Sequence, residues 1–195
     1  MKKCDNCPQR NPNLKFCLSE QIKQFDFEEL QNDLLEAIKL FYEKDVDLLK
    51  RGANEVCITS HIFHYFALLY EKKYSMYHID PEYNKNGRQA KYYAPKQYAI
   101  PDLIIHRRNC NKYNLLYVEY KVNCSACSES DFRKIVDFVS SDIAVSHSGV
   151  AVPYRYKYGV AILINPCRVK FSWYRTDDKN SFAENVYRTD SWERV

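Results

Sequence analysis

Two apolar, strand-like runs that carry charged residues constrain the fold of this chain more than any other feature. The first run, Ala99–Ile105, contains Asp102, and the second run, Leu115–Val122, contains Glu119 and Lys121. Ionised side chains are rarely buried in apolar strands without an ionic partner or a metal ion. A divalent cation between the two carboxylates, with the lysine beside it, would satisfy all three charges. Such a combination of groups is suited to the hydrolysis of phosphodiester bonds.

The alternation of side chains along the two runs predicts which residues share a face. Successive side chains of a strand point to opposite faces, so Glu119 and Lys121 lie on the same face as Tyr117. The connecting segment 107–114 is polar and contains three asparagines, which favours a turn. We therefore expect an antiparallel hairpin in which Asp102 and Glu119 meet at one end of the sheet. The alternative is that Asp102 ends a solvated strand and that the glutamate and lysine form a cross-strand salt bridge.

Two helices are predicted before these runs. Apolar residues recur at helical spacing over Phe27–Arg51, and Gly52 is suited to end that helix. Asn54 has a side chain preferred at helix N-caps, so a second helix is expected from there to about Lys73. Glu55 lies in the first turn of this second helix. It either interacts favourably with the helix dipole or lies over a polar site.

The rest of the pattern predicts further strands and a third helix. We expect a first strand at Met76–Glu82, a third helix at Asp131–Val145 and an outer strand at Val169–Arg175. Tyr158–Ile164 is almost continuously apolar, as is typical of a central strand that is buried on both faces. The element order is two helices, three strands, one helix and two strands, which predicts an α/β or α+β domain whose sheet is covered by helices.

Length and composition predict one globular domain. The chain has 195 residues, of which 46% are hydrophobic, and it has no apolar run of the roughly 18 residues that a membrane span needs. The first five residues lack the apolar block of a secretory signal, so we expect a cytoplasmic protein with no membrane partner. We expect the domain to cover residues 27–175, preceded by a cysteine-containing extension, 1–26, and followed by a polar tail, 176–195.

The charged residues of the two runs also form a recognisable motif. Pro101-Asp102, followed after 16 residues by Glu119-Tyr120-Lys121, resembles the motif of the PD-(D/E)XK nuclease superfamily. Ala53–Val56 resembles the Asn-Glu pair that opens the helix before the hairpin in one uncharacterised prokaryotic and mobile-element group of that superfamily. Asp80–Gly87 resembles the segment between that helix and the Pro-Asp strand of the same group. The resemblance covers roughly residues 27–175.

The resemblance implies a fold, an activity and a role for each motif residue. It implies a restriction-endonuclease-like core, in which a hairpin opens a central mixed sheet flanked by helices, and an endonuclease dependent on Mg²⁺ or Mn²⁺ that acts on DNA. Asp102, Glu119 and the main-chain carbonyl of Tyr120 would hold the metal, and Glu55 would be an accessory metal or water ligand. Lys121 would position or deprotonate the attacking water. A partly dry site can lower the pKa of such a lysine, which leaves both roles open.

Basic residues cluster in the segments that flank the predicted carboxylate site. The formal charge is +4, from 29 basic and 25 acidic residues, which is compatible with a nucleic-acid partner but does not establish one. Cations in flanking loops supply sequence-independent affinity for a phosphate backbone. The candidates are Lys85, Arg88, Lys91, Lys96, Arg107 and Arg108. The alternative is an ordinary solvated loop. A homodimer is compatible with double-strand cutting, but the sequence contains no dimerisation signal.

The eight cysteines leave one further choice open. Cys4 and Cys7 form one Cys-x2-Cys pair, Cys124 and Cys127 form another, and two such pairs can make a tetrahedral zinc site. Free reduced thiols are the usual state in a cytosolic protein. Two alternatives to a nuclease therefore remain: a small regulator stapled by structural Zn²⁺, and a catalytically inactive nucleic-acid-binding or interaction module on the same fold.

Overall fold

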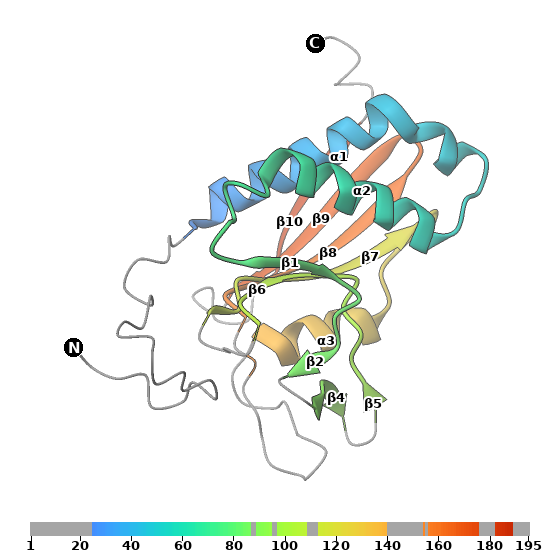
Figure 1. Ribbon diagram of the computed structural model, residues 1–195. Coiled ribbons are helices and arrows are strands. Elements are labelled where there is room, and N and C mark those ends of the chain that lie inside the picture. Colours follow the sequence, from blue (N-terminus) through green and yellow to red (C-terminus); the bar gives the residue numbers. More distant parts are fainter. Residues whose placement is uncertain are drawn as a thin grey trace.

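The computed structural model describes residues 25–86, 89–94, 97–108, 113–139, 154, 156–175 and 182–188. Within these residues the chain forms an α+β fold with a six-stranded mixed sheet in the order β1-β6-β7-β8-β9-β10, flanked by helices (Figure 1). The prediction of a mixed helix-and-strand domain with a helix-covered sheet is confirmed.

The two N-terminal helices begin and end close to where the capping residues predict. Helix α1 is Phe27–Lys50 and α2 is Glu55–Tyr70. The side chain of Asn54 accepts a hydrogen bond from the N–H of Cys57 at 2.8 Å, as an N-cap does. Gly52 has φ of +72°, the left-handed conformation that makes glycine favourable after a helix end. The short connection between the helices follows from these two residues.

The main sheet consists of an antiparallel part and one parallel step. The hairpin strands β6 and β7 are antiparallel, as predicted, and β1 pairs antiparallel with the other edge of β6. Strands β7 and β8 are parallel and are connected through helix α3, while β9 and β10 each pair antiparallel with the preceding strand. The bounds are β1 His78–Pro81, β6 Leu103–His106, β7 Leu116–Val122, α3 Glu129–Val139, β8 Tyr158–Asn165, β9 Arg168–Arg175 and β10 Phe182–Arg188.

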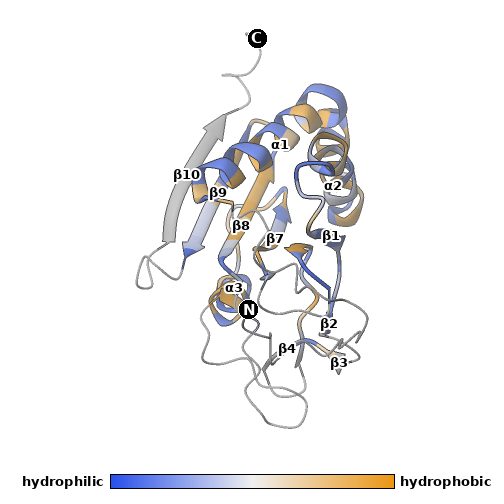
Figure 2. Cartoon of the chain, turned by 60° about the vertical axis from the view of Figure 1, so that its left-hand side comes forward, coloured by the Kyte–Doolittle hydropathy of each residue, from blue (hydrophilic) through white to orange (hydrophobic). Residues whose placement is uncertain are grey.

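The helices cover opposite faces of this sheet. Helices α1 and α2 lie together on one face and α3 lies on the other, and the two views agree on this (Figures 1 and 2). Strand β8 is buried along nearly its whole length and is drawn largely in the hydrophobic colour of Figure 2, as its continuous apolar run predicts. Gly159 in β8 lets α3 approach closely, because a Cβ there would lie only 2.8 Å from Cγ2 of Val139.

Four short strands between β1 and β6 were not predicted. Strands β2 (Lys85–Asn86) and β3 (Gln89–Ala90) form one two-stranded sheet, and β4 (Tyr92–Ala94) and β5 (Gln97–Tyr98) form another. They lie beside the main sheet, on the side of α3 (Figure 1). Strands of two or three residues are too short for an alternating pattern to be visible in the sequence.

Described residues on the outer side of both predicted domain boundaries pack or pair with the core. Phe25 is 1% exposed and stacks on Tyr74 with ring centroids 4.2 Å apart, so the core includes a residue of the segment assigned to the N-terminal extension. Strand β10 pairs with β9 over seven residues, so part of the predicted tail belongs to the main sheet. Helix α3 begins at Glu129, two residues before the prediction, and residues 140–145 of the predicted helix lie outside the described residues.

Within the described residues, no helix is both long and apolar enough to cross a bilayer.

Candidate carboxylate site on strands β6 and β7

The register of the hairpin brings Asp102 and Glu119 to the same face of the sheet. Leu103 pairs with Val118 in this antiparallel register, so Asp102, which directly precedes β6, lies opposite Glu119. Paired residues of neighbouring strands share a face. This is the face that α3 covers, because Ile104 and Tyr117, the next pair along, belong to the α3 core cluster. The predicted meeting of the two carboxylates at the open end of the hairpin agrees with this register.

Glu119 is a buried carboxylate with two side-chain donors. It is 2% exposed, and its Oε1 accepts a hydrogen bond from the hydroxyl of Tyr117 at 2.6 Å. Its Oε2 accepts one from Nζ of Lys134, on α3, at 3.3 Å. Burial, and next the negative charge of Asp102, raise the pKa of Glu119 to about 7, against the opposing effects of Lys134 and Tyr117.

Asp102 is held by the backbone of the neighbouring strand. Its Oδ2 accepts a hydrogen bond from the N–H of Tyr120 at 2.5 Å. Among the described residues, none donates a hydrogen bond to its second oxygen, Oδ1. Burial raises the pKa of Asp102 to about 6, although the Tyr120 N–H and the Lys121 ammonium act in the opposite direction. Two adjacent carboxylates whose charged forms are both disfavoured make a site that a hard cation would stabilise.

Lys121 contacts the accessory glutamate from α2. Its Nζ lies 3.2 Å from Oε1 of Glu55, whose other oxygen accepts the N–H of Val122 at 3.3 Å. Burial alone would lower the pKa of Lys121, but the nearby charges of Glu55, Asp131 and Asp102 outweigh it, and the pKa is raised. The direction of this shift is opposite to the lowering that a partly dry site can produce. Lys121 is an ammonium group at neutral pH, which favours a positioning or charge-stabilising role over that of a base.

The position of Glu55 explains how a residue of α2 reaches a site on the α3 face. Helix α2 covers the opposite face of the sheet, but its N-terminus lies where β7 ends, and Glu55 bonds the last residue of that strand. Of the two roles left open for Glu55, contact with a polar site agrees with this geometry. The Tyr120 side chain points to the opposite face, where it is 1% exposed in the core beneath α1 and α2. Only its main-chain atoms are therefore available to the site.

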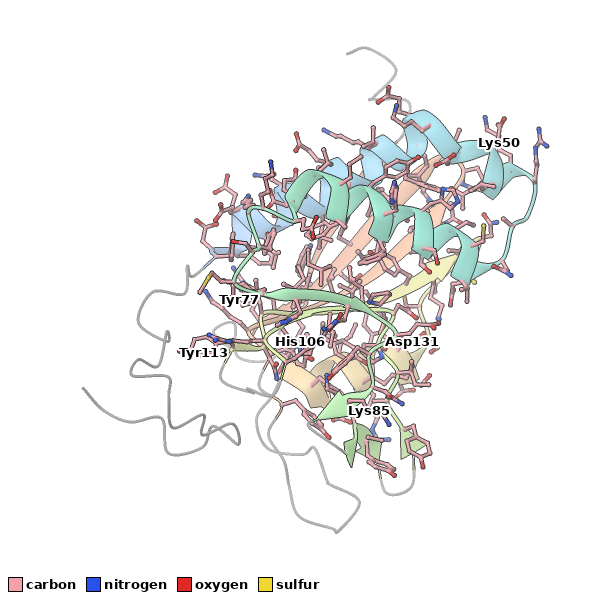
Figure 3. All side chains as sticks on the ribbon, viewed as in Figure 1. Lys50, Tyr77, Lys85, His106, Tyr113 and Asp131 are labelled. Carbon is pink, nitrogen blue, oxygen red and sulfur yellow. The ribbon has the colours of Figure 1, made fainter. Side chains whose placement is uncertain are left out.

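Two residues of α3 were missed as members of this site. Lys134 contacts Glu119, and it also lies 3.6 Å from Oδ1 of Asp131 one turn earlier. Asp131 accepts hydrogen bonds from the backbone N–H and the hydroxyl of Ser128, which closes the first turn of α3 where Figure 3 labels it. A lysine in the middle of an amphipathic helix gives no sequence signal of its own. Only its spacing of three from Asp131 on the helix could have indicated a shared face.

The four basic candidates within the described residues are not all exposed. Lys85 is exposed on β2 (Figure 3), but Lys91 is 2% exposed, and its Nζ donates to the hydroxyl of Tyr156 at 2.7 Å. The prediction that Lys91 is a surface cation for phosphate is therefore wrong. Burial lowers the pKa of Lys91 to about 7, against the attraction of Asp80. The apolar stem and the tyrosines around it make this lysine part of the core.

The hairpin-turn arginines differ in their surroundings. Arg108 is half exposed and its Nε donates to Oδ2 of Asp80 at 2.8 Å, so its charge is already paired. Burial would raise the pKa of Asp80, but hydrogen bonds from His106 and Arg108 hold it well below its usual value. Arg107 is partly exposed. Arg88 and Lys96 lie outside the described residues, so their predicted part in nucleic-acid binding stays a prediction.

Only two of the four cysteines of the predicted zinc site lie within the described residues. Cys124 is exposed and Cys127 is partly buried, and both are free thiols, while Cys4 and Cys7 lie outside the described residues. Burial raises the pKa of Cys127 to about 11, and the neighbouring Asp131 adds to this effect. A zinc site that joins all four cysteines stays a prediction.

The donor set for a divalent cation is small. Across the described part of the chain, no three His, Cys, Asp or Glu side chains are grouped so that they could hold a metal ion. The candidate set is two carboxylates, Asp102 and Glu119, together with main-chain oxygen from the strand that carries Glu119. Such a set fits Mg²⁺, which needs few protein ligands because it retains several waters.

No protein-family model, no curated protein and no solved structure matches this chain.

Proposed function

We propose that this protein is a metal-dependent nuclease that hydrolyses phosphodiester bonds in DNA. One observation carries the proposal: two carboxylates from adjacent strands, the buried Glu119 and the partly buried Asp102, lie opposite each other on one face, with Lys121 two residues beyond Glu119. Two ionised carboxylates in a poorly solvated site are costly in free energy without a cation, because they lose hydration and repel each other. A divalent cation between them removes this cost.

The fold around the pair supports the same proposal. The hairpin β6–β7 enters a mixed sheet, is followed by α3 and then by the parallel strand β8, and is preceded by α2 with Glu55 at its start. A hairpin in a mixed sheet that helices flank is what the PD-(D/E)XK resemblance implies, and this agreement supports the proposal. We therefore propose a restriction-endonuclease-like core, with Pro101-Asp102 and Glu119-Tyr120-Lys121 as its motif.

Each residue of the site has a separate task in this proposal. Asp102, Glu119 and the main-chain carbonyl of Tyr120 would hold Mg²⁺ or Mn²⁺. A bound divalent ion supplies a lowered water pKa and neutralises charge on the phosphate. Lys121, which Glu55 holds at 3.2 Å as an ammonium group, stabilises the charge that develops on the phosphoryl oxygens. Glu55 thus acts on the reaction by fixing this lysine.

DNA is proposed as the substrate on two grounds. The PD-(D/E)XK resemblance implies it, and the chain carries a net positive charge of +4, with an exposed Lys85 on β2 and a partly exposed Arg107 directly after β6. Lys91 and Arg108 add little to this attraction, because the first is buried and the second is paired with Asp80.

The test is cleavage by the purified protein of supercoiled plasmid, linear duplex DNA, single-stranded DNA and RNA. Each substrate is incubated with Mg²⁺, with Mn²⁺ and with a chelator. Asp102→Asn and Lys121→Met are compared with Asp47→Asn, an isosteric change at an exposed carboxylate on α1. We expect metal-dependent cleavage of DNA, reduced about 100-fold or more in the first two variants and unchanged in the third.

The outcomes separate the candidate functions. Cleavage that persists in the chelator or in Asp102→Asn would contradict the proposed mechanism. Folded protein that binds DNA but cleaves no substrate would favour the inactive binding module. Preferential cleavage of RNA would keep the mechanism and correct the substrate.

A further inference from the structure

The proposed reaction does not use Lys134, yet this residue is the cation that contacts the central carboxylate. Its Nζ lies 3.3 Å from Oε2 of Glu119, whereas Lys121 is directed to Glu55. Within the described residues, Lys134 is the only basic side chain within 4 Å of Glu119. The lysine of the motif and the lysine of α3 therefore serve different carboxylates.

The burial of Glu119 requires a counter-charge whenever no metal is bound. Its side chain is 3% exposed and it stands beside Asp102, whose charge repels it. An ionised carboxylate in such a place is strongly destabilising without a partner. The Lys134 side chain is 21% exposed, so it can bring its ammonium to the buried oxygen while keeping contact with solvent.

Helix α3 also carries a second carboxylate, Asp131, that can pair with the Lys134 ammonium group. Asp131 lies 3.6 Å from Nζ of Lys134 and is fixed in position by Ser128. The helix itself is firmly seated: Phe138 packs on Tyr117 with ring centroids 4.6 Å apart, and Gly159 allows the close approach to β8. The ammonium already lies within 4 Å of both carboxylates, so a small rotation of the flexible lysine side chain is enough to shift its charge from Glu119 toward Asp131 without movement of the helix.

We propose that Lys134 is a positioning residue whose ammonium group neutralises Glu119 when no metal is bound. When a divalent cation binds Glu119, the ammonium group turns to pair with Asp131 instead. This inference rests on the proposed function, because it assumes that Glu119 is a metal ligand. It differs from that function in its consequence: Lys134 opposes metal binding while it stabilises the empty site.

The test measures Mn²⁺ affinity by titration calorimetry and, separately, thermal unfolding in the presence of a chelator. We expect Lys134→Met to bind Mn²⁺ about tenfold more tightly, since a competing positive charge is gone, and to unfold at a lower temperature without metal. Lys134→Arg should resemble the wild type in both measurements. Asp131→Asn, which retains an acceptor for the Ser128 donors, should bind Mn²⁺ several-fold more weakly, because the displaced lysine has lost its second partner.

The matched control is Arg133→Gln, an exposed basic residue next to Lys134 on the same helix. It should change neither measurement. If Lys134→Met lowers both the unfolding temperature and the Mn²⁺ affinity, or leaves the affinity unchanged, Lys134 is only a structural residue and the inference is overturned while the proposed function stands. If the wild type binds no Mn²⁺, both are overturned. If Lys134→Met does not fold, unchanged affinity in Asp131→Asn overturns the inference.

Discussion

Burial shifts the protonation of Asp102, Glu119 and Lys91 toward their neutral forms. Asp102 and Glu119 have raised pKa values because their carboxylates are removed from water, and Lys91 has a lowered pKa for the same reason. The two carboxylates lie where a cation can compensate them. Lys91 has instead a hydroxyl partner, Tyr156, and aromatic neighbours. The same physical cause thus produces a candidate reactive site in one place and a core contact in the other.

Asp102→Asn is expected to stabilise the metal-free protein at high pH. The pKa of Asp102 is about 6 in the folded protein and 3.8 ordinarily, so the folded state holds the proton more tightly. The stability that this provides is present below about pH 4 and is lost as the pH rises through 6. In a chelator, the variant should therefore exceed the wild type by about 1–3 kcal/mol in free energy of unfolding at pH 8 and equal it at pH 4. Urea denaturation at the two pH values measures this. A variant that is less stable than the wild type at pH 8 would show that Asp102 is not destabilised by burial.

Lys91→Met tests the opposite case. The folded pKa of Lys91, about 7, lies below its ordinary value of 10.5, so the unfolded state binds the proton more tightly. The cost of burying the charged lysine is fully present below pH 7 and decreases as the pH rises toward 10.5. The stability of the wild type relative to Lys91→Met should therefore increase with pH, by about 2 kcal/mol between pH 7 and 9. Guanidinium denaturation across this range measures how the stability difference changes with pH. A difference that does not change with pH would mean that the Lys91 ammonium group is exposed to water.

At the scale of elements, the contact between α3 and β8 depends on one missing side chain. A Cβ on Gly159 would lie 2.8 Å from Cγ2 of Val139 and closer still to Ile135. Gly159→Ala should lower the free energy of unfolding by about 1–3 kcal/mol, because both side chains or the helix must shift. Denaturant unfolding measures the loss, with Ala161→Gly in the same strand as a control for glycine content. Full stability of Gly159→Ala would mean that α3 lies further from β8.

Elements with a regular pattern or a capping residue could be predicted from the sequence. Asn54 and Gly52 mark the ends of α2 and α1 because their conformational preferences are local. The Asp102–Glu119 pair could be predicted as well, since the alternation of a strand fixes its face. Strand β10 could not, because polar and apolar residues do not alternate regularly along Phe182–Arg188. The burial of Lys91 and the contact of Lys134 with Glu119 were also not predictable. Both depend on what other segments place beside an ordinary lysine.

At the scale of the whole molecule, the site collects charged groups from three separate parts of the chain. Glu55 comes from the start of α2, Asp102 and Glu119 from the hairpin, and Lys134 from α3. The two faces of the sheet are covered by different helices, and β7, which carries Glu119 and Lys121, lies between α2 and α3 (Figure 1). A change in α2 or α3 can therefore alter the electrostatics of the site without altering the hairpin that carries its carboxylates.

This arrangement has a consequence for the order in which the chain folds. The hairpin β6–β7 is a local structure that can form early, whereas the parallel β7–β8 pair must wait until α3 and the segments around it are in place. Until α3 docks, Asp102 and Glu119 stand side by side with no lysine from that helix to balance them. During synthesis on a ribosome, the acidic pair precedes Lys134 by at least 15 residues. Like charges at opposed positions destabilise an antiparallel pair, so we expect a peptide that spans only the hairpin to be less stable than the same hairpin packed against α3.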